Sequence, residues 1–252
     1  MFTNAIVRTP GKNFNQGITT AKLEKPDYFT TLRQHDAYCK VIENCGLNIT
    51  ILPPDPDYPD CPFVEDTAVI TKDFVIITRP GDKKRQGEEE KIEEVLRPFR
   101  KIEKIKSPGT VDGGDILQAE NHFFIGLSGR TNTEGAKQLG TIFSRYGYTF
   151  STISVINLLH LKSGVSYLGK NILILHKDLC SSKEFKSFIK IPVLKKERYA
   201  ANSLMINNSL LLPEGFPDTR KKLKELGFPV YELEMSEFQK MDGGLSCLSL
   251  RF

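Results

Sequence analysis

Three side chains that could act together in nucleophilic catalysis stand at separate points of the chain, each near small residues. Cys247 ends the run Met241-Asp-Gly-Gly-Leu-Ser-Cys247, His160 lies in Leu-Leu-His160-Leu-Lys-Ser, and Asp112 opens Asp112-Gly-Gly-Asp115. A thiol, an imidazole and a carboxylate are the parts of a nucleophile activated by a base that an acid orients. Because most chains of this size contain such a trio, its weight depends on whether the fold can bring the three residues together.

Length and composition are those of a globular protein. The 252 residues are 39% hydrophobic and 26% charged, and the formal net charge is only +4. Lysine and arginine alternate with glutamate along the expected helices, so the charges form solvated faces and we expect no nucleic-acid partner. No apolar run approaches the roughly 18 residues that span a bilayer, and the N-terminal residues resemble a strand, not a secretion signal. We therefore expect no membrane partner.

The cysteines and histidines are scattered. Five cysteines occur without a CxxC pair, and the four histidines do not cluster. This pattern is typical of free thiols in a reducing cytoplasm, and it offers no ligand set with metal spacing. We expect a cytoplasmic protein that needs neither a metal nor a cofactor.

An α/β unit recurs along the chain: a strand, a turn with proline or glycine, an amphipathic helix and a second strand. In the first copy, the three- and four-residue steps from Leu32 to Cys45 indicate a helix, and Gly46 follows as its stop. In the five copies, the first strand is expected at 4–8, 74–78, 123–126, 171–175 and 210–212. The helices are expected at 31–45, 88–99, 133–146, 182–188 and 217–226, and the second strands at 48–52, 101–105, 149–155, 191–194 and 229–233.

A further short strand precedes each copy after the first, and a last strand at 245–250 would complete the first copy. The preceding strands are expected at 67–71, 115–119, 165–167 and 204–206. A chain built this way closes into a ring, in which the turns leading into these strands face one axis. Asp66, Asp112, His160 and Cys247 stand at such turns, so the ring would bring them together. An ordinary open α/β sheet is the alternative interpretation of the same pattern.

The sequence resembles the dimethylarginine dimethylaminohydrolases, specifically the short bacterial forms, which belong to the guanidino-group-modifying enzymes. Matching stretches extend over the whole chain and include Phe63-Val-Glu-Asp66, Pro108-Gly-Thr-Val-Asp112, His160-Leu-Lys162, Tyr199-Ala-Ala-Asn202 and Asp242-Gly-Gly-Leu-Ser-Cys247. The resemblance implies a single catalytic domain, residues 1–252. It also implies a fold of the α/β class, a five-bladed ββαβ propeller with pseudo-five-fold symmetry, called a pentein. This fold agrees with the repeat.

The resemblance implies hydrolysis of Nω-methylated arginines (dimethylarginine and monomethylarginine) to citrulline and di- or monomethylamine. A cysteine thiolate attacks the guanidinium carbon, and water hydrolyses the resulting thiouronium. Matching positions make Cys247 the nucleophile and His160 the general acid and base. Asp112 matches the carboxylate that orients the imidazole. Asp115 stays open between a functional role and a role in the tight turn.

Carboxylates are expected at the guanidinium end of the substrate, because a planar cation in a pocket poor in water needs anionic partners. By resemblance, Asp66 is the main anchor, and Asp60 and Glu65 are further contacts. Asp60 lies among prolines, where capping of a loop is the alternative role.

The amino-acid end of the substrate carries a carboxylate, and the resemblance assigns it to Arg85 and Arg130. Without the family match, Arg85 would be read as part of a solvated charge cluster. Ile18 and Met241 match positions at the pocket border, and the loop 11–20 suggests a lid. The expected partner is thus a small arginine-like molecule, and a homodimer is possible.

Two other functions remain open at this point. A citrulline or arginine hydrolase would use the same residue set on the same fold, because the leaving group varies within the superfamily. A non-catalytic ring protein that binds arginine-like ligands belongs to a different class. A binder has no need of Cys247 beside His160, which favours an enzyme.

Overall fold

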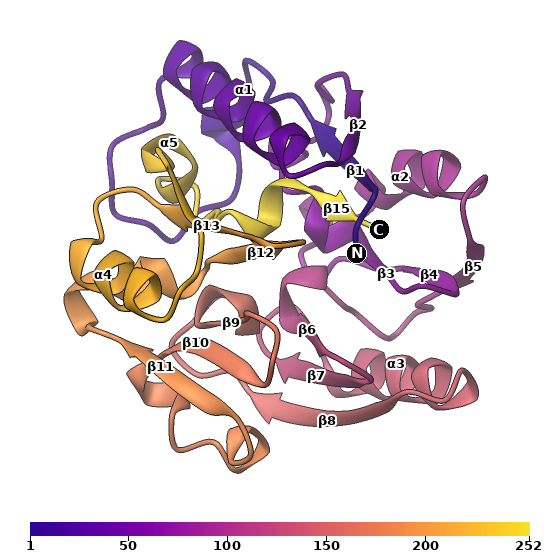
Figure 1. Ribbon diagram of the computed structural model, residues 1–252. Helices are drawn as coiled ribbons and strands as arrows, with labels where there is room; N and C mark the ends of the chain where they lie inside the picture. Colours follow the sequence, from indigo (N-terminus) through magenta and orange to yellow (C-terminus); the bar gives the residue numbers. More distant parts are fainter.

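Five three-stranded sheets, arranged around a central axis, make up the computed structural model, which describes residues 1–252 (Figure 1). In each sheet the middle strand pairs antiparallel with the strand nearer the axis and parallel with the outer strand. The sheets are β15-β1-β2, β3-β4-β5, β6-β7-β8, β9-β10-β11 and β12-β13-β14. This arrangement confirms the predicted ring of five repeats.

The strands fall close to the predicted positions. They are β1 (Asn4–Arg8), β2 (Asn48–Leu52), β3 (Ala68–Ile70), β4 (Phe74–Ile77), β5 (Lys101–Lys104), β6 (Ile116–Ala119), β7 (His122–Leu127), β8 (Thr149–Ser154), β9 (Val165–Tyr167), β10 (Ile172–His176), β11 (Ile189–Val193), β12 (Leu204–Ile206), β13 (Ser209–Pro213), β14 (Val230–Leu233) and β15 (Leu250–Arg251). The outer strands are largely exposed and the middle strands buried, because each middle strand has neighbours on both edges and packs on both faces.

Helices connect the middle and outer strands in four of the five repeats. They are α1 (Tyr28–Asn44), α2 (Glu88–Leu96), α3 (Thr133–Arg145) and α4 (Pro217–Glu225), with a further short helix α5 (Ser236–Gln239). The side chain of Asp27 caps α1 and that of Asn132 caps α3, each accepting a backbone N–H in the first turn. None of the helices combines the length and the apolar character needed to cross a membrane.

The helix predicted at 182–188 is wrong. Two single 3-10 turns, Lys177–Leu179 and Lys183–Phe185, connect β10 to β11 instead. Ser181 and Ser182 stand between the two turns, and serine has a lower helix propensity than alanine or leucine. The buried Phe185 packs in the hydrophobic cluster of this repeat, where a helix would otherwise place its apolar side.

The last strand closes the ring, as predicted. β15 pairs antiparallel with β1 through Ala5 and Arg251, so the two termini lie side by side (Figure 1). The strand is shorter than the predicted range 245–250, because Ser246–Leu248 form a 3-10 turn before it.

Hydrophobic clusters between neighbouring repeats hold the ring rigid. In one of them, Ile6 and Leu250 of the first sheet pack with Val75 and Ile77 of the second. Since the apolar side of each repeat is buried against the next, no repeat can shift alone without opening a cavity.

A 3-10 turn precedes the strand of each sheet that lies nearer the axis, and we call these five segments the inner turns. They are Val64–Thr67, Gly113–Asp115, Leu161–Ser163, Lys195–Ala201 and Ser246–Leu248. The first contacts the second and the last, the second contacts the third, and the third contacts the fourth. Residues far apart in the sequence are thereby gathered at the axis, as the repeat predicted.

Candidate active site

A pocket at the axis is lined by most of the predicted site residues. Its walls are Ile18, Asp60, Phe63, Asp66, Arg85, Arg130, Leu159, His160, Met241, Asp242, Gly243 and Cys247. Of the predicted residues, only Glu65 and Asp112 do not line it. A larger cavity of about 470 Å³, beside α2, contains none of the predicted residues. The chemistry is therefore concentrated at the smaller, axial pocket.

Cys247 lies in the inner turn that precedes β15 and is half-buried. Its sulfur accepts the backbone N–H of Gly244 at 3.4 Å. Burial raises the pKa of the thiol to about 12, and the charges of Glu65 and Asp66 add to this rise. At neutral pH the sulfur is therefore a thiol, not a thiolate.

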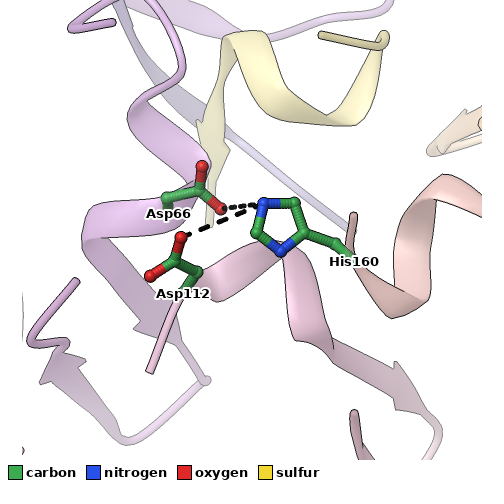
Figure 2. A group of neighbouring side chains, drawn as sticks. All are labelled: Asp66, Asp112 and His160. Atoms are coloured by element: carbon green, nitrogen blue, oxygen red, sulfur yellow. Dashed lines mark ion pairs between the residues drawn. The ribbon is translucent and has the colours of Figure 1, made fainter. Parts of the chain in front are cut away.

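His160 directly precedes the third inner turn and is buried. Its Nδ1 lies 3.3 Å from Oδ2 of Asp115. On the other side of the ring, its Nε2 lies 3.9 Å from Oδ1 of Asp66 and 3.9 Å from Oδ2 of Asp112 (Figure 2). Burial opposes the charged imidazolium, but the three carboxylates outweigh it and raise the pKa of His160 to about 9. The imidazole therefore holds a proton at neutral pH.

The carboxylate that bonds to the imidazole is Asp115, whereas Asp112, which was expected to orient the imidazole, faces it at 3.9 Å without a hydrogen bond. Besides Nδ1 of His160, Asp115 accepts the backbone N–H of Leu161 and the hydroxyls of Ser128 and Thr131. Its position is thus fixed from four directions.

The side chain of Asp112 bonds to the backbone of Gly81 and not to the imidazole. Its Oδ1 accepts the backbone N–H of Gly81 at 2.7 Å, whereas its Oδ2 has no hydrogen-bond partner. Burial and the neighbouring charge of Asp66 raise the pKa of Asp112 to about 6. Asp112 thus contributes a buried carboxylate that faces Nε2 of His160 without bonding to it.

Asp66 carries a permanent negative charge in the pocket. Its Oδ1 accepts the backbone N–H of Gly114, and its Oδ2 forms an ion pair with Arg85. Burial favours the neutral acid, but His160 and Arg85 outweigh it and lower the pKa of Asp66 to about 2. Such a carboxylate is suited to hold a cationic group.

The guanidinium of Arg85 forms its hydrogen bonds with groups of the protein. The predicted contact was with the carboxylate of the substrate. It bonds to Asp66, to both oxygens of Glu88 and to the carbonyl of Phe63. The alternative interpretation of Arg85 as part of a solvated charge cluster is excluded, because Arg85 is buried. Arg85 lines the pocket mainly as the partner that keeps Asp66 ionised.

Arg130 has fewer protein partners for its guanidinium than Arg85 has. Its only ion pair is with Asp82, at 3.6 Å, and its side chain is 15% exposed. The backbone N–H of Arg130 bonds to Ser128, just before α3. Its guanidinium therefore retains donors for an anion at the pocket mouth.

Asp60 and Ile18 contact each other directly. Both carboxylate oxygens of Asp60 accept the backbone N–H of Ile18, at 3.2 and 3.0 Å. A side chain at Gly17 would place its Cβ 2.4 Å from the same carboxylate and 3.1 Å from Met241. The loop that carries Ile18 can approach this closely only with glycine at that position.

Asp242 was not predicted, although it fastens the loop 11–20 over the pocket. Its Oδ2 accepts the hydroxyl of Thr19, at 3.2 Å, and both the hydroxyl and the backbone N–H of Thr20. The sequence signal for this role is its place in the nucleophile motif, five residues before Cys247. Leu159 was missed as well, and its place before His160 is the only signal.

Asp66, Asp112 and His160 are also close enough to ligate a metal ion, since their ligand atoms lie within 4.8 Å of one another. However, a metal would have to displace the proton that these same carboxylates hold on His160. The geometry is better suited to proton transfer than to coordination.

Two known proteins with similar sequences share one description. No protein-family model matches the chain. It is 44% identical over 254 residues to a dimethylarginine dimethylaminohydrolase of Pseudomonas aeruginosa, with 100% of both chains covered. It is 34% identical over 251 residues to one of Streptomyces coelicolor, covering 98% of this chain and 96% of the relative.

Two solved structures, one of the Pseudomonas aeruginosa relative and one of a more distant protein, superpose on the chain. A cysteine-to-serine mutant of the Pseudomonas aeruginosa enzyme, complexed with citrulline, superposes with a TM-score of 0.98 over 100% of both chains. The N-terminal domain of a cyanobacterial arginine dihydrolase, 18% identical, superposes with a TM-score of 0.89 over 98% of this chain and 97% of that chain. At that identity the likeness supports the pentein fold alone.

Proposed function

The chain belongs to the dimethylarginine dimethylaminohydrolase family, and we propose that it hydrolyses Nω-methylated arginines to citrulline and di- or monomethylamine through a covalent intermediate on Cys247. One observation supports the proposed reaction independently of family membership. A single pocket combines a thiol, an imidazole that holds a proton and a carboxylate that is ionised at all ordinary pH values. This combination fits a cationic guanidinium that must lose an amine.

In the first half of the reaction, the bound cation activates the nucleophile. The guanidinium lies against Asp66, and its positive charge beside Cys247 lowers the thiol pKa, so that the thiol proton is released to solvent. The thiolate attacks the guanidinium carbon and forms a tetrahedral intermediate. His160 then donates the proton on Nε2 to the departing amine, and an alkylthiouronium remains on the sulfur.

In the second half, His160 has lost its proton and acts as a base. It takes a proton from water through Nε2, and the hydroxide attacks the thiouronium carbon. Collapse of the second tetrahedral intermediate releases citrulline and expels the Cys247 sulfur, which regains its proton as the new hydroxyl group loses one. Asp115 holds Nδ1 throughout, so Nε2 is the nitrogen that exchanges protons with the substrate.

A substrate panel tests the proposed function. Purified protein is incubated with dimethylarginine, monomethylarginine, arginine and citrulline, and the products citrulline, ornithine, ammonia and alkylamines are quantified. We expect citrulline and one equivalent of alkylamine from the methylated arginines, with the highest kcat/KM for them. A preference for arginine or citrulline would replace the proposal by an arginine or citrulline hydrolase, and no turnover of any of them would favour a binding protein.

Arg130 should determine recognition of the amino-acid end. Arg130→Ala should lower kcat/KM for methylated arginines by about 10- to 100-fold, the size of one lost charge-assisted contact. Turnover of methylguanidines that lack a carboxylate should stay within about twofold of the wild type. Steady-state kinetics on both substrate types measure this, with Arg145→Ala, at an exposed arginine on α3, as the control. Equal losses on both types would mean that Arg130 is structural.

We also propose that the protein works in the cytoplasm, which the absence of any disulfide among its five cysteines supports. A single catalytic domain, independence of metals and cofactors, and the possible homodimer stay predictions.

A further inference from the structure

We propose that the ion pair between Lys162 and the buried Glu65 positions the turn that carries the nucleophile and balances the charge beside the thiol, without touching the substrate. The inference deepens the proposed function, because it takes Cys247 to be the nucleophile. It also replaces the predicted role of Glu65 as a substrate contact.

Both carboxylate oxygens of Glu65 are occupied by the protein. Oε1 accepts Nζ of Lys162 at 2.7 Å and Nη2 of Arg251 at 3.1 Å, while Oε2 accepts the hydroxyl of Ser246 at 2.7 Å. Glu65 is 3% exposed and does not line the pocket. Its carboxylate is therefore directed at the protein and away from the pocket.

Ser246 directly precedes the nucleophile, and each of its polar groups forms a hydrogen bond within the protein. Its backbone N–H donates to Oδ1 of Asn202, its hydroxyl accepts from Nδ2 of Asn202, and its carbonyl accepts from Arg251. The hydroxyl proton goes to Glu65. Because Cys247 follows directly, these bonds determine where its sulfur can lie.

The network connects four of the five inner turns. Glu65, Lys162 and Ser246 each lie within an inner turn, and Asn202 directly follows a fourth. Nδ2 of Asn202 also donates to the carbonyl of Lys162 at 2.9 Å, which joins the third and fourth of these turns. The position of Cys247 is thus set against the ring as a whole and not by its own short strand.

Glu65, Asp66 and Lys162 act electrostatically on the thiol. The other charged or titratable groups that line the same pocket are Asp60, Arg85, Arg130, His160 and Asp242. Glu65 and Asp66 raise the pKa of Cys247, and Lys162 lowers it. Glu65 therefore destabilises the thiolate of Cys247, and Lys162 stabilises it. The positive charge of Lys162 offsets the negative charge of Glu65, the residue that holds Ser246 in place.

The opposite effects of Glu65 and Lys162 on the thiol pKa can be tested by substituting each residue. Alkylation of Cys247 by iodoacetamide, a neutral reagent, is followed at pH 8 by mass mapping of the peptide. The thiolate fraction sets this rate, so Lys162→Met should slow it about tenfold and Glu65→Gln should accelerate it about tenfold. Lys162→Arg keeps the charge and should stay near the wild type. Lys91→Met, which removes a lysine from a buried carboxylate at Asp55, is the matched control and should have no effect.

Turnover provides a second readout. Both Lys162→Met and Glu65→Gln should lower kcat at least about tenfold while KM changes less than about threefold, since neither residue contacts the substrate. Should Lys162→Met fail to fold in thermal unfolding, Lys162→Gln removes the same charge and carries the same expectation. Shifts of both alkylation rates in the same direction, or no shift in either, would overturn the proposal. A raised KM with unchanged kcat in Glu65→Gln would return Glu65 to substrate binding. Because alkylation needs no turnover, its outcome stands even if the proposed reaction is wrong.

Discussion

Replacing Cys247 with serine should reduce the turnover of dimethylarginine by at least about a thousandfold. A serine hydroxyl is a much poorer nucleophile than a thiolate, and loss of the nucleophile typically costs this much or more. The fold should be unaffected, because the sulfur makes only one hydrogen bond, to the backbone of Gly244, which a hydroxyl can also accept. Citrulline formation and thermal unfolding, measured on the same preparation, check both parts.

Cys180→Ser provides the matched control for this substitution. Cys180 is also half-buried but lies outside the pocket, between the two 3-10 turns that connect β10 to β11. Its replacement should leave kcat/KM within about twofold of the wild type. Retention of more than a tenth of the activity in Cys247→Ser would remove Cys247 from the mechanism.

Replacing Asp66 with asparagine should have the second largest effect. We expect kcat/KM for methylated arginines to fall by at least about 10- to 100-fold, since a charge-assisted contact is worth roughly 1.5–3 kcal/mol. The change also leaves Arg85 with Glu88 as its remaining anionic partner and lowers the pKa of His160 by removing a neighbouring anion. Steady-state kinetics with dimethylarginine measure the loss, and the pH dependence of kcat reports the change at His160.

Asp178→Asn is the control for Asp66→Asn. Asp178 likewise faces a histidine, His176, at 3.2 Å, but it is an exposed residue outside the pocket. Its substitution should not alter kinetics. Unchanged kcat/KM in Asp66→Asn would mean that the guanidinium is held by another group.

The ring was predictable because it follows from local patterns, whereas most of the other pocket residues were assigned by resemblance to the family. Strands with alternating turns and helices predict the repeat, and each inner turn directly precedes a strand of that repeat. Asp66, His160 and Cys247 could therefore be assigned to one axis from their positions alone, and the structure places all three in one pocket.

What the sequence could not provide is the direction in which side chains point. Asp112 and Asp115 flank the same two glycines, yet only Asp115 bonds to the imidazole, because Asp112 accepts from Gly81 of the preceding repeat. Arg85 stands among charged residues in the sequence and is nevertheless buried against Asp66 and Glu88. Each of these outcomes depends on contacts between repeats, and such contacts leave no periodic signal in the sequence.

The helix missing from the fourth repeat has a similar cause. The segment 177–188 resembles the helical segments of the other repeats in its place between two strands. Phe185 packs into the cluster beneath β10, and the surrounding backbone forms two separate turns instead. Tertiary packing overrides the expectation from repeat position.

Trapping the covalent intermediate tests the central claim most directly. The protein is mixed with excess dimethylarginine, quenched in acid during steady-state turnover and digested, and the peptide that contains Cys247 is examined by mass spectrometry. We predict a mass gain equal to that of dimethylarginine less dimethylamine, on Cys247 alone, which disappears when the substrate is exhausted. Full turnover to citrulline with no adduct on Cys247, or an adduct on Cys39, Cys45, Cys61 or Cys180 instead, would contradict the account.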